Sequence, residues 1–128
     1  MIVNGRDVKF CYNVLASIDV AKICPDEDLE NIQALFSGPY DEQVTNTNKF
    51  MIALHKGYIE SEKWKKPSFD EKLLTEDELL RMETRDYLKL QDEAIAAYIG
   101  DQKRAIETEP IKQKSGKKTE TGTPKKLN

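Results

Sequence analysis

The feature that most constrains the fold is an apolar segment in the middle of the chain. Its apolar residues recur three and four positions apart, the spacing of one face of an α-helix. They are Phe50, Ala53, Leu54 and Tyr58, and Met51, Ile52 and Ile59 widen the same face. A helix that is apolar on nearly every side lies at the centre of a fold. Gly57 in this segment indicates the close approach of another backbone. The sequence therefore predicts a central helix, capped by Thr45 or Asn46 and ending near Trp64.

A β-hairpin is expected at the beginning of the sequence. Asn4-Gly5, a strong two-residue signal of a hairpin turn, separates an apolar segment over 1–3 from a second segment over 6–12. In the second segment apolar residues alternate with polar ones, as on one face of a strand; they are Val8, Phe10 and Tyr12. Because an isolated hairpin is marginally stable in water, we expect it to pack on helices or to pair with another chain.

Two shorter helices are expected between the hairpin and the central helix. The first is capped by Asn13 and ends at Pro25. Its apolar residues at helical spacing are Val14, Leu15, Ile18 and Ala21. The second begins with the acidic residues 26–28, which favour a helix N-terminus, and ends at Gly38-Pro39. Its buried stripe is Leu29, Ile32, Leu35 and Phe36. The following residues, 40–44, fit a loop or an irregular turn.

Further helices are expected after a linker over 68–74. Thr75-Glu76-Asp77-Glu78 is a capping box that starts a helix. The helical pattern runs to about Arg104, which is long for so small a domain, so we expect a break near Glu83. The last helix carries one stripe of Tyr87, Leu90, Ala94, Ala97 and Tyr98 and an adjacent one of Leu88, Ile95 and Ile99. The predicted fold is mainly α: a short N-terminal β-hairpin followed by four to five helices in a small bundle, with a disordered C-terminal tail.

Charge divides the chain into two parts. Residues 1–104 carry a net charge of about −6, and residues 105–128 one of about +3. The C-terminal part is rich in Lys, Thr and Gly and cannot bury enough apolar surface to offset the entropy of ordering. We therefore expect a β-hairpin plus helical domain over 1–104 and a disordered Lys-rich tail over 105–128. Since the tail lacks Arg and aromatic residues and the domain is acidic, we do not expect a nucleic-acid partner.

No pattern in the sequence predicts catalysis, a cofactor or a metal site. The one histidine, His55, has no ligand-type partner four residues away, so we expect it at the surface or boundary of a helix. Cys11 and Cys24 are expected as reduced thiols of a cytosolic protein, with one bridge between them left open. Nucleophile and phosphate-loop motifs are absent, as are a signal peptide and an apolar run that could span a membrane. We therefore expect that the protein is not an enzyme.

Three stretches of the chain together suggest a family. They are the opening Ile2–Phe10, the central Ala53–Tyr58, and the late segment Leu74–Leu80 followed by Ala94–Ala97. Over about residues 1–104 the chain resembles the tail assembly chaperones of long-tailed phages and prophages of Gram-positive bacteria. The resemblance implies a mainly helical protein of the bacterial host cytoplasm. Such a protein coats the tape measure protein, helps tail tube subunits polymerise around it, and is not retained in the virion.

The resemblance also implies partners, and alternative functions stay open beside it. The expected partners are the tape measure protein and the tail tube protein, and a homo-oligomer fits the same role. Candidate partner-binding residues are the aromatic residues in or beside predicted loops, Tyr40, Trp64 and Phe69. Trp64 is favoured because Trp is enriched in binding hot spots, and for all three the alternative is packing onto the core. The alternative functions are a structural head–tail connector or tail completion protein, and a generic helical protein-interaction module.

Overall fold

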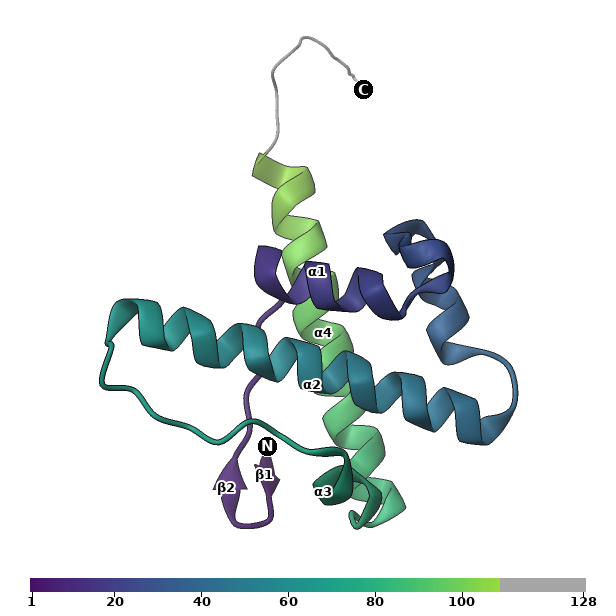
Figure 1. Cartoon of the computed structure of the whole chain (residues 1–128), viewed down its shortest axis with the longest axis horizontal. Coiled ribbons are helices and arrows are strands. Elements are labelled where there is room, and N and C mark those ends of the chain that lie inside the picture. The colour runs from purple at the N-terminus through teal and green to yellow at the C-terminus, as the bar shows by residue number, and fades with distance from the viewer. Residues whose placement is uncertain (109–128) are drawn as a thin grey trace, which may run out of the picture. The chain divides into compact units, whose positions relative to one another are not determined.

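The computed structural model describes the backbone of residues 1–108 and the side chains of residues 1–103. A short antiparallel hairpin is followed by helices (Figure 1). The elements are β1 Ile2–Val3, β2 Arg6–Asp7, α1 Val14–Ile23, the 3₁₀ helices η1 Pro25–Glu27 and η2 Leu29–Phe36, α2 Tyr40–Lys65, α3 Glu76–Leu80 and α4 Thr84–Thr108. The predicted mainly α fold with an N-terminal hairpin is confirmed. The helix α4 continues past the boundary predicted at residue 104, and the rest of the expected disordered tail lies outside the described residues.

The chain forms two compact units, Met1–Tyr98 and Ile99–Asn128. The first unit contains the hairpin, α1, η1, η2, α2, α3 and the first part of α4, together with the whole hydrophobic core. The second unit includes the last described turns of α4. The division therefore falls inside a continuous helix rather than in a loop.

The hairpin follows from its turn residues. Asn4 and Gly5 both have positive φ angles, 51° and 81°, as the two-residue turns that match the twist of a hairpin require. The two strands pair antiparallel, with Ile2 opposite Asp7. The second strand ends at Asp7, earlier than the alternation up to Tyr12 suggested, because the chain then leaves the hairpin and crosses to α2.

The crossing point is Gly57 of α2, where two backbones come into contact. A Cβ atom at Gly57 would lie 2.5 Å from the carbonyl oxygen of Cys11 and 3.1 Å from the Cβ of Ala16. The Cys11 amide donates to the Leu54 carbonyl oxygen at 3.0 Å. Asn13 donates through Nδ2 to the Gly57 carbonyl oxygen at 3.0 Å, and its Oδ1 accepts from the Ala16 amide, capping α1. The predicted close approach at Gly57 and the predicted Asn13 cap are both confirmed.

The segment between α1 and α2 differs from the prediction in two respects. Residues 25–36 form 3₁₀ turns rather than one α-helix, since Asp26 has a positive φ of 59° and Asn31 departs from helical geometry. The helix α2 begins at Tyr40, where a loop or irregular turn was expected. Pro39 precedes it, and Asp41 and a second acidic residue in the first turn favour the positive end of the helix dipole.

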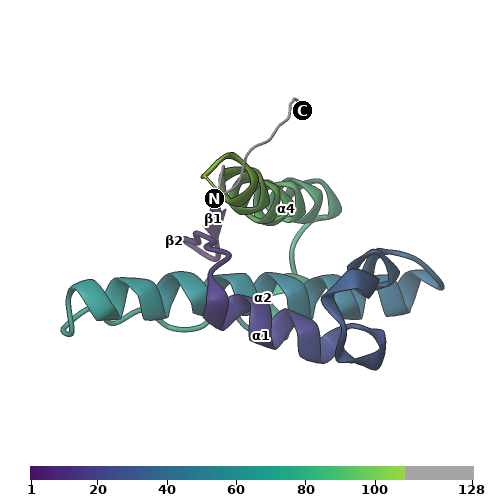
Figure 2. The same ribbon diagram turned by 90° about the horizontal axis from the view of Figure 1, so that it is seen from above.

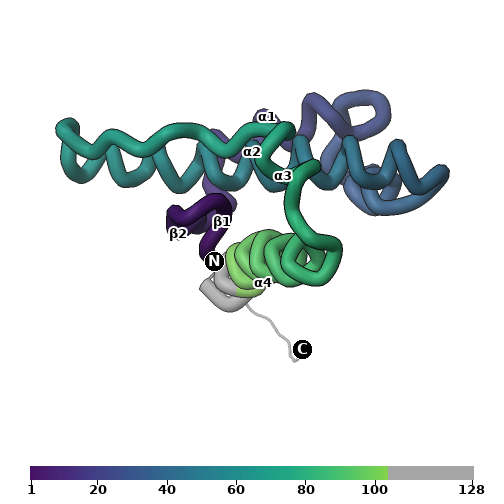
Figure 3. Tube along the Cα trace, turned by 90° about the horizontal axis from the view of Figure 1, so that it is seen from below, coloured from purple at the N-terminus to yellow at the C-terminus, as the bar shows by residue number. Residues whose placement is uncertain are grey.

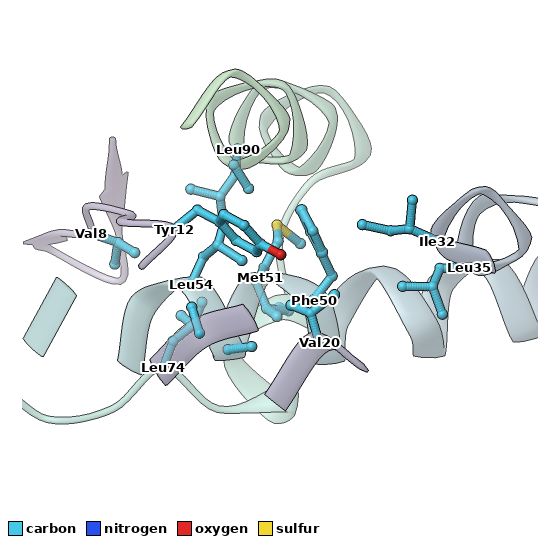
Figure 4. Close-up of a cluster of buried hydrophobic side chains, with 14 of the residues drawn as sticks. Val8, Tyr12, Val20, Ile32, Leu35, Phe50, Met51, Leu54, Leu74 and Leu90 are labelled. Atoms are coloured by element: carbon cyan, nitrogen blue, oxygen red, sulfur yellow. The ribbon is translucent and has the colours of Figure 1, made fainter. Parts of the chain in front are cut away.

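The hydrophobic core surrounds α2 (Figure 4). Phe50, Met51 and Leu54 of this helix are at most 1% exposed, as expected for a central helix. The helix α1 lies antiparallel beside α2, and the first part of α4 crosses α2 on another side (Figures 1 and 2). From α4, Leu90 points toward α2, and the Tyr98 ring lies edge-on to Phe50 with centroids 6.1 Å apart. Both α1 and the first part of α4 thus pack on α2.

A connection without regular structure, residues 66–75, follows α2; we call it the strap. It returns beside α2 in an extended form (Figure 3). Its Leu74 side chain is 1% exposed and belongs to the core. At its end Thr75 and Glu78 make the predicted capping box of α3. The helices α3 and α4 are separate, so the predicted break near Glu83 is confirmed.

One arginine joins the hairpin to the strap and to α3. Arg6 Nη2 donates to Glu78 Oε1 at 3.0 Å, and Arg6 Nη1 donates to the Lys72 carbonyl oxygen. Asn4 Nδ2 lies 3.4 Å from the other Glu78 oxygen. Partial burial opposes the charge on Glu78, but the hydrogen bonds from Arg6, from the Thr75 backbone and from Asn4 prevail and lower the pKa of Glu78 to about 2. An ionised Glu78 therefore holds these elements together.

Replacing Gly57 by Ala is expected to destabilise the protein by about 1–3 kcal/mol. Alanine favours a helix by about 1 kcal/mol relative to glycine, but its Cβ would collide with the Cys11 backbone, which has little room to move. Urea unfolding followed by circular dichroism measures the difference. The matched control, Ser61→Ala in the same helix, is expected to change the free energy of unfolding by no more than about 0.5 kcal/mol. A stabilised Gly57→Ala variant would contradict the close contact.

The low pKa of Glu78 predicts a specific loss of stability in acid. Because the folded pKa of about 2 lies below the ordinary value of 4.5, the stabilisation is complete above pH 4.5 and is lost as the pH falls toward 2. Glu78→Gln should remove on the order of 1–2 kcal/mol at pH 7 and flatten the pH dependence of unfolding between pH 4.5 and 2. Glu83→Gln, which changes an exposed glutamate, is the control. Identical pH profiles for the wild type and Glu78→Gln would contradict the assignment.

Candidate functional site

The outer face of α1 exposes apolar side chains to solvent. Val14 is 78% exposed, Ile18 50% and Leu15 36%, whereas Ala16 and Val20 of the same helix are completely buried. Positions 14 and 18 are one helical turn apart and therefore adjacent on the surface. We call Val14, Leu15 and Ile18 the α1 apolar face. A cluster of exposed apolar side chains on a helix is typical of an interaction site.

The orientation of α1 has a steric cause. The contact at Gly57 requires a small side chain on the facing helix, and Ala16 supplies it, with its Cβ 3.1 Å from the place where a Gly57 Cβ would lie. Val20 is one turn further along the same side. The larger apolar residues at helical spacing are consequently turned outward. The spacing of these residues was evident in the sequence, but it does not distinguish a face in the core from a face left for a partner.

The structure separates the predicted partner-binding residues. Tyr40 is the first residue of α2 and 72% exposed, and Trp64 is in its last turn and 89% exposed. At 1.5 Å per residue they are about 36 Å apart along the helix axis. Phe69 lies in the strap and is half-buried, with its ring edge-on to Tyr58 at a centroid distance of 6.1 Å. Phe69 thus packs onto α2, while Tyr40 and Trp64 are available for contacts at opposite ends of that helix.

The two ends of α2 differ in charge. Between Lys22 and Lys49 the sequence has no Lys or Arg and six acidic residues, all exposed: Asp26, Glu27, Asp28, Glu30, Asp41 and Glu42. Near Trp64, Lys63 and Lys65 pair with glutamates one turn earlier at 3.9 and 3.4 Å. The segment before α2 and the first turn of α2 are therefore strongly negative, whereas the end of α2 carries a tryptophan beside balanced ion pairs.

The position predicted for His55 is wrong. The expected surface or boundary histidine is completely buried in α2. Its Nε2 is 2.5 Å from Glu71 Oε2, and its Nδ1 accepts a hydrogen bond from the Leu74 amide at 2.9 Å. Because Nδ1 accepts, the ring proton is on Nε2 and is donated to Glu71. Both partners follow in the strap, too far along the sequence for a local spacing rule to detect, and together they engage both ring nitrogens.

Metal-binding and redox groups are sparse in the part of the chain that the structure describes. Residues 1–103 contain no group of three or more His, Cys, Asp or Glu side chains able to hold a metal ion. No disulfide joins Cys11 and Cys24, as expected; Cys24 is buried and Cys11 is half-buried. Burial, with a smaller contribution from the nearby Asp28 carboxylate, raises the pKa of Cys24 above its ordinary value. No helix within residues 1–108 is long and apolar enough to cross a lipid bilayer.

Comparisons of the chain with protein families, with curated protein sequences and with solved structures give no match. The most distinctive features of the chain's described surface are the α1 apolar face and the exposed Trp64.

The exposure of Trp64 has a direct spectroscopic consequence, since it is the only tryptophan in the chain. With 89% of its surface exposed, its fluorescence in the folded protein should match that of tryptophan in water and change little on unfolding in urea. Iodide, a charged quencher excluded from protein interiors, should quench it almost as efficiently as it quenches the free amino acid. A blue-shifted emission protected from iodide would mean that Trp64 is covered, by a second copy of the chain or by another segment.

Proposed function

We propose that the protein is a tail assembly chaperone of a long-tailed phage or prophage, which acts in the bacterial host cytoplasm by binding the helical tape measure protein and assisting tail tube polymerisation. The observation that carries the proposal is the α1 apolar face: two side chains at least half exposed, Val14 and Ile18, on a helix whose other side is firmly packed. The proposal names this family because the opening, central and late segments of the sequence resemble such chaperones.

The physical properties of this face suit a helical partner. Val14 and Ile18 are one turn apart, the spacing at which apolar side chains of two helices interdigitate. The face is also rigid, because Asn13 fixes the start of α1 to the Gly57 carbonyl oxygen. A rigid face loses little conformational entropy when a partner binds. The proposed role requires binding and release and needs no catalytic group.

The proposal predicts that polar substitutions on the α1 apolar face weaken binding without unfolding the protein. The double variant Val14→Ser, Ile18→Ser should bind the tape measure protein at least tenfold more weakly, about 1.4 kcal/mol, because the substitutions remove apolar contacts. Its thermal midpoint should stay within a few degrees of the wild type, since both side chains are exposed. The measurement is co-expression with the tape measure protein, followed by co-purification and an assay of the partner's solubility.

Two further variants make the result specific. Leu88→Ser removes a similarly exposed apolar side chain from α4 and should leave binding unchanged. Trp64→Ser tests the residue favoured from the sequence. Loss of binding in Trp64→Ser alone would move the partner site to the end of α2. If the wild type neither binds the tape measure protein nor keeps it soluble, the chaperone proposal is wrong, and presence of the chain in purified particles would then favour a head–tail connector.

A further inference from the structure

The strap is attached to α2 through the one histidine of the chain. His55 is completely buried, and its two ring nitrogens bond two different residues of the strap. The Leu74 amide donates to Nδ1 at 2.9 Å, and Nε2 donates to Glu71 Oε2 at 2.5 Å. Leu74 is itself buried in the core, so its amide has no water available as a replacement acceptor. The attachment therefore requires the neutral form of the imidazole.

Protonation of His55 affects the two bonds in opposite directions. The added proton must go to Nδ1, because Nε2 already carries one. Nδ1 then becomes a donor that faces the donor N–H of Leu74, and this hydrogen bond is lost. The bond from Nε2 to the Glu71 carboxylate becomes an ion pair and is strengthened.

The charged and titratable groups around the ring come from four elements. Glu71 comes from the strap, and Tyr58 of α2 stacks on the ring at a centroid distance of 6.5 Å. Arg6 of β2 lies 3.9 Å from the same Glu71 oxygen that contacts His55, and it also pairs with Glu78 of α3 at 3.0 Å. Glu71 therefore keeps a cationic partner on each side when His55 is charged. The strap is held at Glu71 in both protonation states of His55. Only its attachment at Leu74 depends on a neutral His55.

We propose that the strap is an acid-sensitive latch: protonation of His55 releases the strap from α2 at Leu74, while the strap stays attached at Glu71. Histidine is the side chain whose ordinary change of charge falls between about pH 5 and 8. Release withdraws Leu74 from the core and uncovers apolar surface on α2 beside Leu54 (Figure 4). It also frees the chain next to Thr75, the capping residue that positions α3. The latch does not depend on the proposed chaperone function.

The test is amide hydrogen exchange measured by NMR on the full chain at pH 7.5 and pH 5.5, with each rate corrected for the intrinsic pH dependence of exchange. The protection factor of the Leu74 amide is expected to fall at least tenfold at pH 5.5. The amides of the α2 core, such as that of Leu54, are expected to keep their protection. An unchanged Leu74 protection factor would overturn the proposal, and so would an equal loss at every amide, which indicates global unfolding.

Three variants separate the latch from a general effect of acid. His55→Asn places an acceptor oxygen near the position of Nδ1 and does not titrate, so the protection of Leu74 should be independent of pH. Glu71→Gln removes the charge that holds the other end, and release in acid should then extend along the strap. Asp70→Asn, the matched control beside it, changes an exposed carboxylate and should behave as the wild type. A pH-dependent loss of Leu74 protection in His55→Asn would refute the latch.

A second measurement does not depend on the folding of a variant. The ¹⁵N chemical shifts of the His55 ring report the protonation of each nitrogen in the wild-type protein. The latch requires Nδ1 to gain its proton over the same pH interval in which Leu74 loses protection. If the ring is fully protonated at pH 5.5 while Leu74 remains protected, or if Leu74 is released while the ring stays neutral, the proposal is wrong.

Discussion

The contact on which the rest of the structure depends is the one between the chain at Cys11 and the backbone of Gly57. A side chain of any size at position 57 would occupy the space held by the Cys11 carbonyl oxygen. Because the two backbones touch, Asn13 can bond the Gly57 carbonyl oxygen and cap α1 with the same side chain. One glycine and one asparagine thus set where the chain leaves the hairpin and where α1 lies on α2. The remaining elements of the first unit pack around that pair of helices.

The same contact determines which residues α1 shows to solvent. A close approach at Gly57 admits only a small residue opposite it, and Ala16 meets that requirement. Val14 and Ile18 are displaced to the outside as a result. An interaction surface on this helix therefore follows from packing inside the fold. A substitution that enlarged Gly57 would alter the core and, through the position of α1, the surface as well.

Much of the fold could be predicted from local sequence signals. Asn4-Gly5 made a hairpin, Asn13 capped a helix, and the capping box from Thr75 to Glu78 started another, since each of these motifs satisfies its hydrogen bonds within four residues. The early start of α2 was missed because Pro39 and the acidic residues after it also fit a turn. Helical spacing alone did not reveal the outward orientation of Val14 and Ile18.

Contacts between residues far apart in the sequence could not be predicted from local sequence patterns. The burial of His55 depends on Glu71 and Leu74, which reach it only after the chain has turned back along α2. The salt bridge between Arg6 and Glu78 joins residues 72 positions apart in the sequence. No periodicity connects such pairs, because their proximity results from the completed fold. The predicted partner-binding aromatic residues differ in burial for the same reason. Phe69 packs against the Tyr58 ring of α2, whereas Trp64 is exposed.

The position of α2 in the sequence has a consequence for how the protein forms on the ribosome. The hairpin and α1 are synthesised before the helix that holds them, and their bonds to Gly57 and Glu78 reach residues made much later. Domains fold as units, and transiently exposed apolar surface promotes aggregation. The N-terminal third must therefore remain without its core until α2 has emerged. The strap, by contrast, contacts residues made shortly before it, so α2 and the strap can associate as soon as both have left the exit tunnel.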